Sequence, residues 1–265
     1  SKLDSLMDII PSVEQIKNSL EFMSRTTVAF WGTHEVKDTF ELCRCLAAEA
    51  VGSAILVWLA TTNCAQFPDN TGVLKISLTV GLTIATVIMI FAPVSGSNIS
   101  PAVTLGLLVV GRISAFKALL YVPAQILGVV IGTIIYEAST PESVQGENLC
   151  SNGINVSAGV TVEEALVVEA VLTFILVYLI LTISDKNIYP HIPSIGITLC
   201  GLFVTSSFLM GLRYSGVSLN PARSIGLAIL KHIVWDSIWV YWVGPLVGAA
   251  LAGLIYRNFF DAAFQ

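Results

Sequence analysis

One short motif with hydrogen-bonding side chains occurs twice in this hydrophobic sequence. Residues 95 to 106 read SGSNISPAVTLG, and residues 215 to 226 read SGVSLNPARSIG. Each copy places a hydrogen-bonding side chain, Ser100 or Asn220, directly before a Pro-Ala pair, and Arg223 follows the second pair. No arrangement of nucleophile, base and oxyanion donors and no Gly-rich phosphate loop accompanies them, so an enzyme is not predicted. The motifs place hydrogen-bonding groups in an otherwise apolar chain, and the elements around them decide what these groups can contact.

Two carboxylates repeat at the same spacing as the motifs. Glu49-Ala50-Val51 recurs 120 residues later as Glu169-Ala170-Val171, and Tyr121 and Gly128 recur as Tyr241 and Gly248. Three regions share one offset without a gap, which predicts a tandem duplication of a unit of about 120 residues.

The elements that must position these residues lie in a bilayer. The 265-residue chain is 55% apolar and only 12% charged, and its mean hydropathy is +0.81, unlike an ordinary soluble domain. A membrane helix needs about 20 mostly apolar residues, and no alternation typical of a membrane barrel is present. Six stretches qualify as spanning helices: 43 to 63, 73 to 93, 115 to 136, 163 to 184, 193 to 211 and 237 to 258.

Each repeated unit has three spanning helices, so the second unit must lie inverted relative to the first. Each Pro-Ala segment is too short to cross and is predicted to be a re-entrant loop that leads into a half-helix. Pro101 and Pro221 suit a first helical turn, and Ser100 and Asn220 suit N-caps. Two positive helix ends would then meet near the midplane and oppose cations while admitting neutral molecules. The predicted fold class is an all-α membrane protein with an inverted tandem repeat.

The predicted organisation along the chain has five parts. Residues 1 to 42 form a cytoplasmic N-terminal segment, and 43 to 136 form the first repeat with a half-helix near 101 to 111. Residues 137 to 162 form an extracellular loop that has no Lys or Arg. The second repeat covers 163 to 258 with a half-helix near 221 to 231, and 259 to 265 form a cytoplasmic tail.

Several further predictions concern the parts outside the helices. Asn155-Val156-Ser157 matches the N-glycosylation acceptor pattern, and Cys64 and Cys150 lie on the outer side, either as a disulfide or as free thiols. Residues 12 to 24 are either an amphipathic surface helix or disordered. His191 is either a pH-sensing gate or an ordinary loop residue. Ser114 is a phosphorylation site or, preferably, an N-cap. The five cysteines show no metal-ligand spacing, and no metal, cofactor or nucleic-acid partner is expected.

The doubled motif, the paired glutamates and the segment Tyr241-Trp242-Val243-Gly244-Pro245 resemble the aquaporin (major intrinsic protein) family over residues 40 to 258. The resemblance implies six tilted helices and two half-helices around one pore per subunit, a homotetramer in plasma-membrane lipid, and passive flow. It also implies that Glu49 and Glu169 anchor the re-entrant loops. Selectivity by pore diameter, lining donors and electrostatics is the general account of such pores.

The departures from the family pattern concern the solute. The usual first motif reads His-x-Asn-Pro-Ala, but Asn98 and Ser100 replace the His and the Asn, so the midplane loses one amide donor. Ungapped counting from the motifs puts the family's narrow filter on Val80, Phe208, Val217 and Arg223. Compared with water-selective members, Val80 stands in place of an aromatic residue and Phe208 in place of a His. If helix five were rotated, Ser207 would replace Phe208.

This filter has one apolar wall and one donor cluster, which suits glycerol or urea as well as water. Ser224, Ala228, Tyr241 and Trp242 instead resemble the water-type branch, as in insect members that combine such a scaffold with loss of the filter His and pass glycerol. The prediction is a passive channel for water and small uncharged solutes that excludes protons and ions. The alternatives are a strictly water-selective channel, an ion-coupled transporter that uses the buried glutamates, and a junction or adhesion protein with low permeability.

Overall fold

The fold is all-helical throughout the residues that the computed structural model describes, which are 30–32, 38–65, 72–145, 152–185, 193–231 and 235–260. The segment 12–24, for which a surface helix and disorder are the alternatives, lies outside these ranges. So do His191, Cys150 and the last five residues of the tail.

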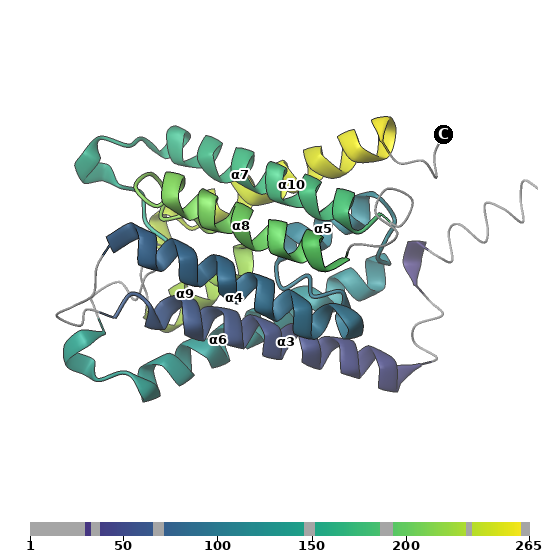
Figure 1. Cartoon of the computed structure of the whole chain (residues 1–265), viewed down its shortest axis with the longest axis horizontal. Helices are drawn as coiled ribbons and strands as arrows, with labels where there is room; N and C mark the ends of the chain where they lie inside the picture. The colour runs from purple at the N-terminus through teal and green to yellow at the C-terminus, as the bar shows by residue number, and fades with distance from the viewer. Residues whose placement is uncertain are drawn as a thin grey trace, which may run out of the picture.

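Six long helices run side by side along the longest axis of the molecule (Figure 1). They have 19 to 25 residues. At 1.5 Å per residue their lengths are about 28 to 37 Å. Among the described residues, five of them, all but the shortest helix, are long and apolar enough to cross a hydrocarbon core of about 30 Å. The chain is therefore an integral membrane protein. The helices are α3 Thr39–Thr62, α4 Gly72–Ser95, α6 Ala115–Ser139, α7 Val162–Ile183, α8 Pro193–Gly211 and α10 Val240–Phe259.

The helix ends follow local capping chemistry and differ from the predicted bounds by a few residues. The helix α3 begins at Thr39, four residues earlier than predicted, because the Asp38 carboxylate accepts a hydrogen bond from the backbone N–H of Glu41 at 3.0 Å. Ser114 caps α6 through the N–H of Lys117, as the sequence predicts. The short η4 helix Trp235–Ser237 precedes α10, which begins three residues later than predicted.

Two short helices lie inside the bundle, towards opposite ends of it (Figure 1). They are α5 Pro101–Val109 and α9 Pro221–Lys231, with 9 and 11 residues, and each begins at the proline of a Pro-Ala pair. The predicted end of α5 at 111 is two residues too late. Gly111 has a φ of +74°, and the N–H groups of Gly111 and Arg112 bond back to the carbonyls of Leu108 and Leu107, which closes the helix.

The half-helices interlock the two repeats. Within each repeat the first and third long helices pack together, α3 on α6 and α7 on α10, while α4 packs on α8 across the repeats. The half-helix α5 packs mainly on α10, and α9 packs on α6, so each half-helix lies against the third long helix of the other repeat.

Equivalent glycines allow the closest of these helix contacts. A Cβ atom on Gly128 of α6 would collide with the carbonyl oxygen of Ala50 on α3, and one on Gly248 of α10 would collide with the carbonyl oxygen of Ala170 on α7. Small residues at such crossings let membrane helices approach closely, which replaces the hydrophobic driving force that lipid does not supply.

Candidate pore

The first re-entrant loop is held by the carboxylate of Glu49, which is fully buried on α3. Its Oε1 accepts from the Ser95 hydroxyl at 2.7 Å and from the Asn98 N–H at 2.9 Å, and its Oε2 accepts from the Ile99 N–H at 2.7 Å. The Gln125 amide of α6 also donates to Oε2, at 2.8 Å. Several donors satisfy the buried charge, as a carboxylate out of water requires.

The second loop repeats this arrangement on α7. Glu169 is fully buried and accepts from the Ser215 hydroxyl at 2.6 Å, the Ser218 N–H at 2.9 Å and the Leu219 N–H at 3.0 Å. Both glutamates therefore bind backbone N–H groups of the segments that lead into the half-helices.

These segments have strained backbones at equivalent positions. The φ angles are +52° at Ser97 and +46° at Ile99, and they are +45° at Val217 and +55° at Leu219. Such values are uncommon for residues other than glycine and persist only where the surroundings hold them, which the carboxylate bonds do here.

The N-terminal ends of the half-helices meet through two reciprocal contacts. The Ser100 hydroxyl donates to the carbonyl of Leu219 at 3.3 Å, and the Asn220 amide donates to the carbonyl of Ile99 at 2.7 Å. Ser100 and Asn220 also cap their own helices by accepting from the N–H groups of Ala102 and Ala222, at 3.2 and 3.0 Å. Pro101, Ala102, Pro221 and Ala222 are all buried at this junction. Two positive helix ends therefore face each other inside the fold.

A narrow cavity of about 60 Å³ lies beside this junction, and three of the four predicted filter residues line it. They are Val80 of α4, Phe208 of α8 and Arg223 of α9. The guanidinium carbon of Arg223 lies 5.8 Å from the centroid of the Phe208 ring, and Arg223 donates to the carbonyl of Val217 at 2.9 Å.

The side chain of Val217, the fourth predicted filter residue, lies elsewhere. It is fully buried, packs at Gly211 and is not part of the cavity lining, whereas its carbonyl holds Arg223. Of Ser207 and Phe208, it is Phe208 that lines the cavity, whereas the Ser207 hydroxyl bonds to the carbonyl of Phe203 in its own helix.

The narrow cavity leads into a wider one of about 540 Å³. Five residues line both cavities: Ile88, Ser97, Asn98, Val103 and Ile180. The wider cavity extends past the end of α5 to Arg112, Ser114 and Lys117. The two cavities thus adjoin beside the half-helix junction, and the wider one extends to one end of the bundle.

The predicted outer loop contributes a buried residue that the sequence did not single out. Asn152 accepts from the Ser224 hydroxyl at 2.8 Å and donates to the carbonyl of Gly216 at 3.3 Å. Ser224 directly follows Arg223 in the chain, and Gly216 directly precedes its partner Val217. Asn152 lies outside the repeated unit, so the duplication gave no signal for it.

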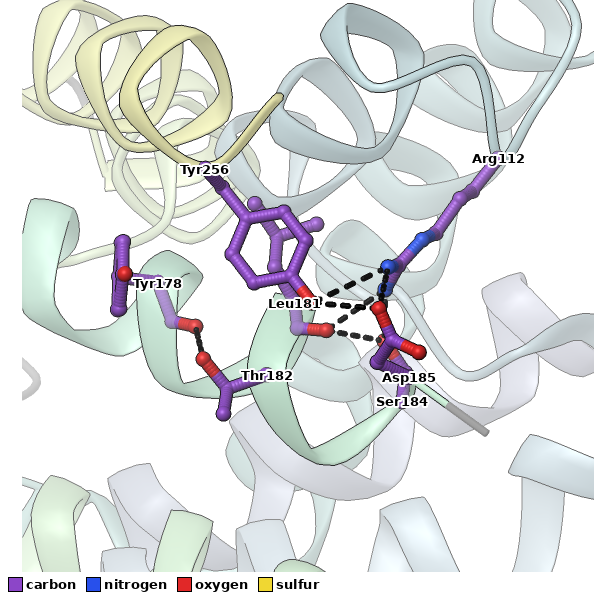
Figure 2. Close-up of polar contacts among 7 residues, drawn as sticks. All are labelled: Arg112, Tyr178, Leu181, Thr182, Ser184, Asp185 and Tyr256. Carbon is purple, nitrogen blue, oxygen red and sulfur yellow. Dashed lines mark hydrogen bonds and ion pairs between the residues drawn. The ribbon is translucent and has the colours of Figure 1, made fainter. Parts of the chain in front are cut away.

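A polar cluster at the other end of the bundle was also missed. Arg112, in the turn after α5, bonds to the carboxylate of Asp185 at 3.0 Å and to the carbonyl of Leu181 at 2.6 Å, while the Tyr256 hydroxyl of α10 donates to Asp185 at 2.7 Å. Figure 2 shows the Asp185 carboxylate between the Arg112 guanidinium and the Tyr256 hydroxyl. Ser184 accepts a further bond from Arg112 at 2.8 Å. This cluster joins the end of α5 to α7 and α10.

Two features predicted for the outer side have defined surroundings. The Asn155 side chain caps η3 Val156–Ala158 and donates to the carbonyl of Arg213 at 3.0 Å, so its amide already joins two loops. Cys64 is disulfide-bonded.

Comparisons with known proteins agree with this architecture. The model of the family described as "Major intrinsic protein" matches residues 36–256. Human "Aquaporin-5" is 38% identical over 210 residues, which cover 79% of this chain and 78% of that protein. "Lens fiber major intrinsic protein" of Lithobates pipiens is 37% identical over 221 residues, covering 82% and 81%. The "aquaglyceroporin from Plasmodium falciparum" superposes with a TM-score of 0.74 at 26% identity, covering 84% of this chain and 98% of that one.

The fold, the paired half-helices and these matches define a membrane channel built from an inverted tandem repeat. The chain belongs to the major intrinsic protein (aquaporin) family. It is accordingly a passive channel and not an enzyme.

Proposed function

We propose that the protein conducts water and small uncharged solutes such as glycerol or urea down their gradients, while it excludes protons and metal ions. The observation that carries the proposal is the meeting of the two half-helix N-termini through Ser100 and Asn220 beside a narrow cavity. Each helix end carries roughly half a positive charge, so a cation at the junction is repelled from both sides. A neutral molecule meets no such barrier.

The passage of polyols or urea is proposed from the walls of the narrow cavity. Phe208 and Val80 supply apolar surface, and Arg223 supplies hydrogen-bond donors in the same lining. Carbon-bonded hydrogens of glycerol can face the apolar side while its hydroxyls face Arg223. A wall of this kind rejects a small polyol only weakly, because hydrophobic pockets discriminate poorly by polarity alone.

We propose that the protein is a homotetramer in the plasma membrane, with both termini in the cytoplasm. The basic residues Arg112 and Lys117 line the wide cavity at one end of the bundle, and positive residues favour the cytoplasmic side. The loop with Asn152 and Asn155 would then be extracellular, where Asn155 is a candidate glycosylation site.

The alternative of strict water selectivity rests on the water-type residues Ser224, Tyr241 and Trp242. Ser224 and Tyr241 bind the loop around the filter, through Asn152 and the carbonyl of Ser215. They support the filter from behind and leave its apolar wall unchanged, so we favour the wider solute range.

Stopped-flow light scattering on proteoliposomes tests the proposal. Sucrose as osmolyte reports water flux, and glycerol or urea reports solute entry. We expect water permeability well above that of empty liposomes and glycerol permeability above it too. Glycerol entry no faster than in empty liposomes, with fast water flux, would favour the strictly water-selective alternative. Absence of both fluxes, with clustering of vesicles, would favour an adhesion role.

A further inference from the structure

The side chain of Asn98 has hydrogen-bonding capacity that the fold does not use. Asn98 is 97% buried, and its amide nitrogen donates to the Thr104 hydroxyl at 3.3 Å. Its second N–H and its carbonyl oxygen make no hydrogen bond to the residues that the structure describes, and the side chain lines both cavities. A buried amide left in this state costs free energy unless a ligand or water completes its bonds.

Asn98 lies where the narrow cavity opens into the wide one, since it lines both. Three of the other four residues that line both cavities, Ile88, Val103 and Ile180, are apolar. The fourth, Ser97, already donates its hydroxyl proton to the carbonyl of Val87 at 3.4 Å. A molecule that crosses this junction therefore finds its side-chain donor and acceptor on Asn98.

The backbone of Asn98 is fixed independently of its side chain. Its N–H bonds to Glu49, and its neighbours Ser97 and Ile99 are both in the left-handed region. The equivalent residue of the second repeat, Ser218, differs because its hydroxyl bonds to Ser224 and to the carbonyl of Asn220. The unused amide is thus particular to the first copy.

The half-helix junction itself offers few donors to a solute. The Ser100 hydroxyl donates to the carbonyl of Leu219 and accepts from the N–H of Ala102, so its proton is occupied. The Asn220 amide donates one N–H to the carbonyl of Ile99, which leaves its second N–H for a solute. The first copy consequently presents its amide two residues before the N-cap Ser100 and not at the cap itself.

We propose that Asn98 is a solute-binding residue of the pore, whose amide donates to and accepts from a water molecule or a polyol hydroxyl between the narrow and wide cavities. The two amides that bind solute, on Asn98 and Asn220, then lie at different depths in the pore. The inference rests on the proposed function, because it assumes that solute passes between the narrow and the wide cavity.

Permeability measurements on Asn98→Leu test this assignment, because leucine has a similar volume and no polar group. We expect its water permeability per channel to fall about three- to tenfold, the effect of one lost hydrogen bond in an otherwise apolar section. Asn98→His restores a polar group but carries a larger ring. Its water flux should therefore be within twofold of wild type, while its glycerol flux stays below that of wild type. A structural role would not produce this divergence between the two solutes.

Thr104→Val is the matched control, because it removes the side-chain partner of Asn98 and keeps the amide. We expect its water permeability to remain within twofold of wild type. Equal loss in Asn98→Leu and Thr104→Val, or wild-type flux in Asn98→Leu, would overturn the assignment. If wild-type protein itself conducts no water, the proposed function fails before the role of Asn98 arises. Protein amount per vesicle and thermal unfolding of each variant are measured alongside.

Discussion

At the scale of single residues, solute range depends on which side chains stand opposite Arg223. Phe208 and Val80 line the narrow cavity with it, while Val217 contributes its carbonyl as the partner of the guanidinium group. Fixed donors and apolar surface thus share the lining of this cavity. The account requires that changing the apolar side alters polyol passage more than water passage.

The double variant Val80→Phe and Phe208→His narrows the filter and makes its apolar wall polar. We expect glycerol permeability to fall by about tenfold or more, since small changes in pocket size and polarity have effects of this order. Water permeability should stay within about threefold. Solute entry into proteoliposomes measures both. Leu82→Phe is the control, because Leu82 lies on the same helix as Val80 and is 67% exposed. It should change neither the glycerol permeability nor the water permeability. An unchanged ratio of glycerol to water flux in the double variant would contradict the assigned walls.

The anchoring carboxylates also act at the residue scale. Glu169→Gln keeps the shape of the side chain but turns an NH₂ group towards N–H or O–H donors, so at least one bond to Ser215, Ser218 or Leu219 is lost. We expect a loss of about 1–3 kcal/mol in the free energy of unfolding, the usual cost of an unsatisfied buried donor. Thermal unfolding in detergent measures it. Glu163→Gln, an exposed change in the first turn of the same helix, should shift stability by less than about 0.5 kcal/mol. Equal stability of the two variants would argue against loop anchoring by Glu169.

At the scale of the elements, the half-helices depend on the long helices that hold them. The contacts of α5 with α10 and of α9 with α6 tie each half-helix to the opposite repeat, and the close α7–α10 crossing at Gly248 sets the position of α10. Errors in these crossings should therefore reach the pore.

Gly248→Ala places a methyl group against the backbone of Ala170. We expect a loss of about 1–3 kcal/mol in stability through overpacking, seen as a lower unfolding midpoint. Gly153→Ala is the control, because an added Cβ there meets no atom within 4 Å. Tolerance of the change at Gly248 equal to that at Gly153 would mean that the crossing is looser than the structure describes.

The cluster of Arg112 and Asp185 makes a second prediction at this scale. A double-mutant cycle of Arg112→Met and Asp185→Asn should give a coupling energy of about 1–3 kcal/mol, because Asp185 is 95% buried and also bonds to Tyr256. The exposed pair of Glu41 and Arg44, at 3.3 Å, should give less than about 0.5 kcal/mol in the same cycle. Thermal unfolding supplies both values. Similar coupling for the two pairs would show that the cluster does not join α5 to α7.

At the scale of the whole molecule, the duplication made most of the fold predictable. One offset of 120 residues and an odd number of spans per unit predicted the inversion and the head-to-head half-helices, because these follow from parity and length. Helix ends were predicted less well where a single side chain or glycine decides them, as at Asp38 and Gly111.

The re-entrant loops were predictable because both copies carry their signal, and Val80, Phe208 and Arg223 were found by counting from the motifs. Asn152 lies outside the repeated unit, and the position equivalent to Asp185 in the first copy is Ala65, so neither could be found by comparing the repeats. Their contacts join residues 64 to 73 positions apart, and only the packed structure brings these together. The side-chain direction of Val217 depended on its left-handed backbone, which valine seldom adopts and the sequence does not reveal.

The central claim is that two positive helix ends meet in one pore and admit only neutral molecules. The most direct test measures water and proton permeability in the same proteoliposomes, by light scattering and by a pH-sensitive dye inside the vesicles. The account predicts a water flux far above that of empty liposomes and a proton flux equal to that of empty liposomes. Proton flux that rises together with water flux, or solute accumulation driven by a proton gradient, would contradict it.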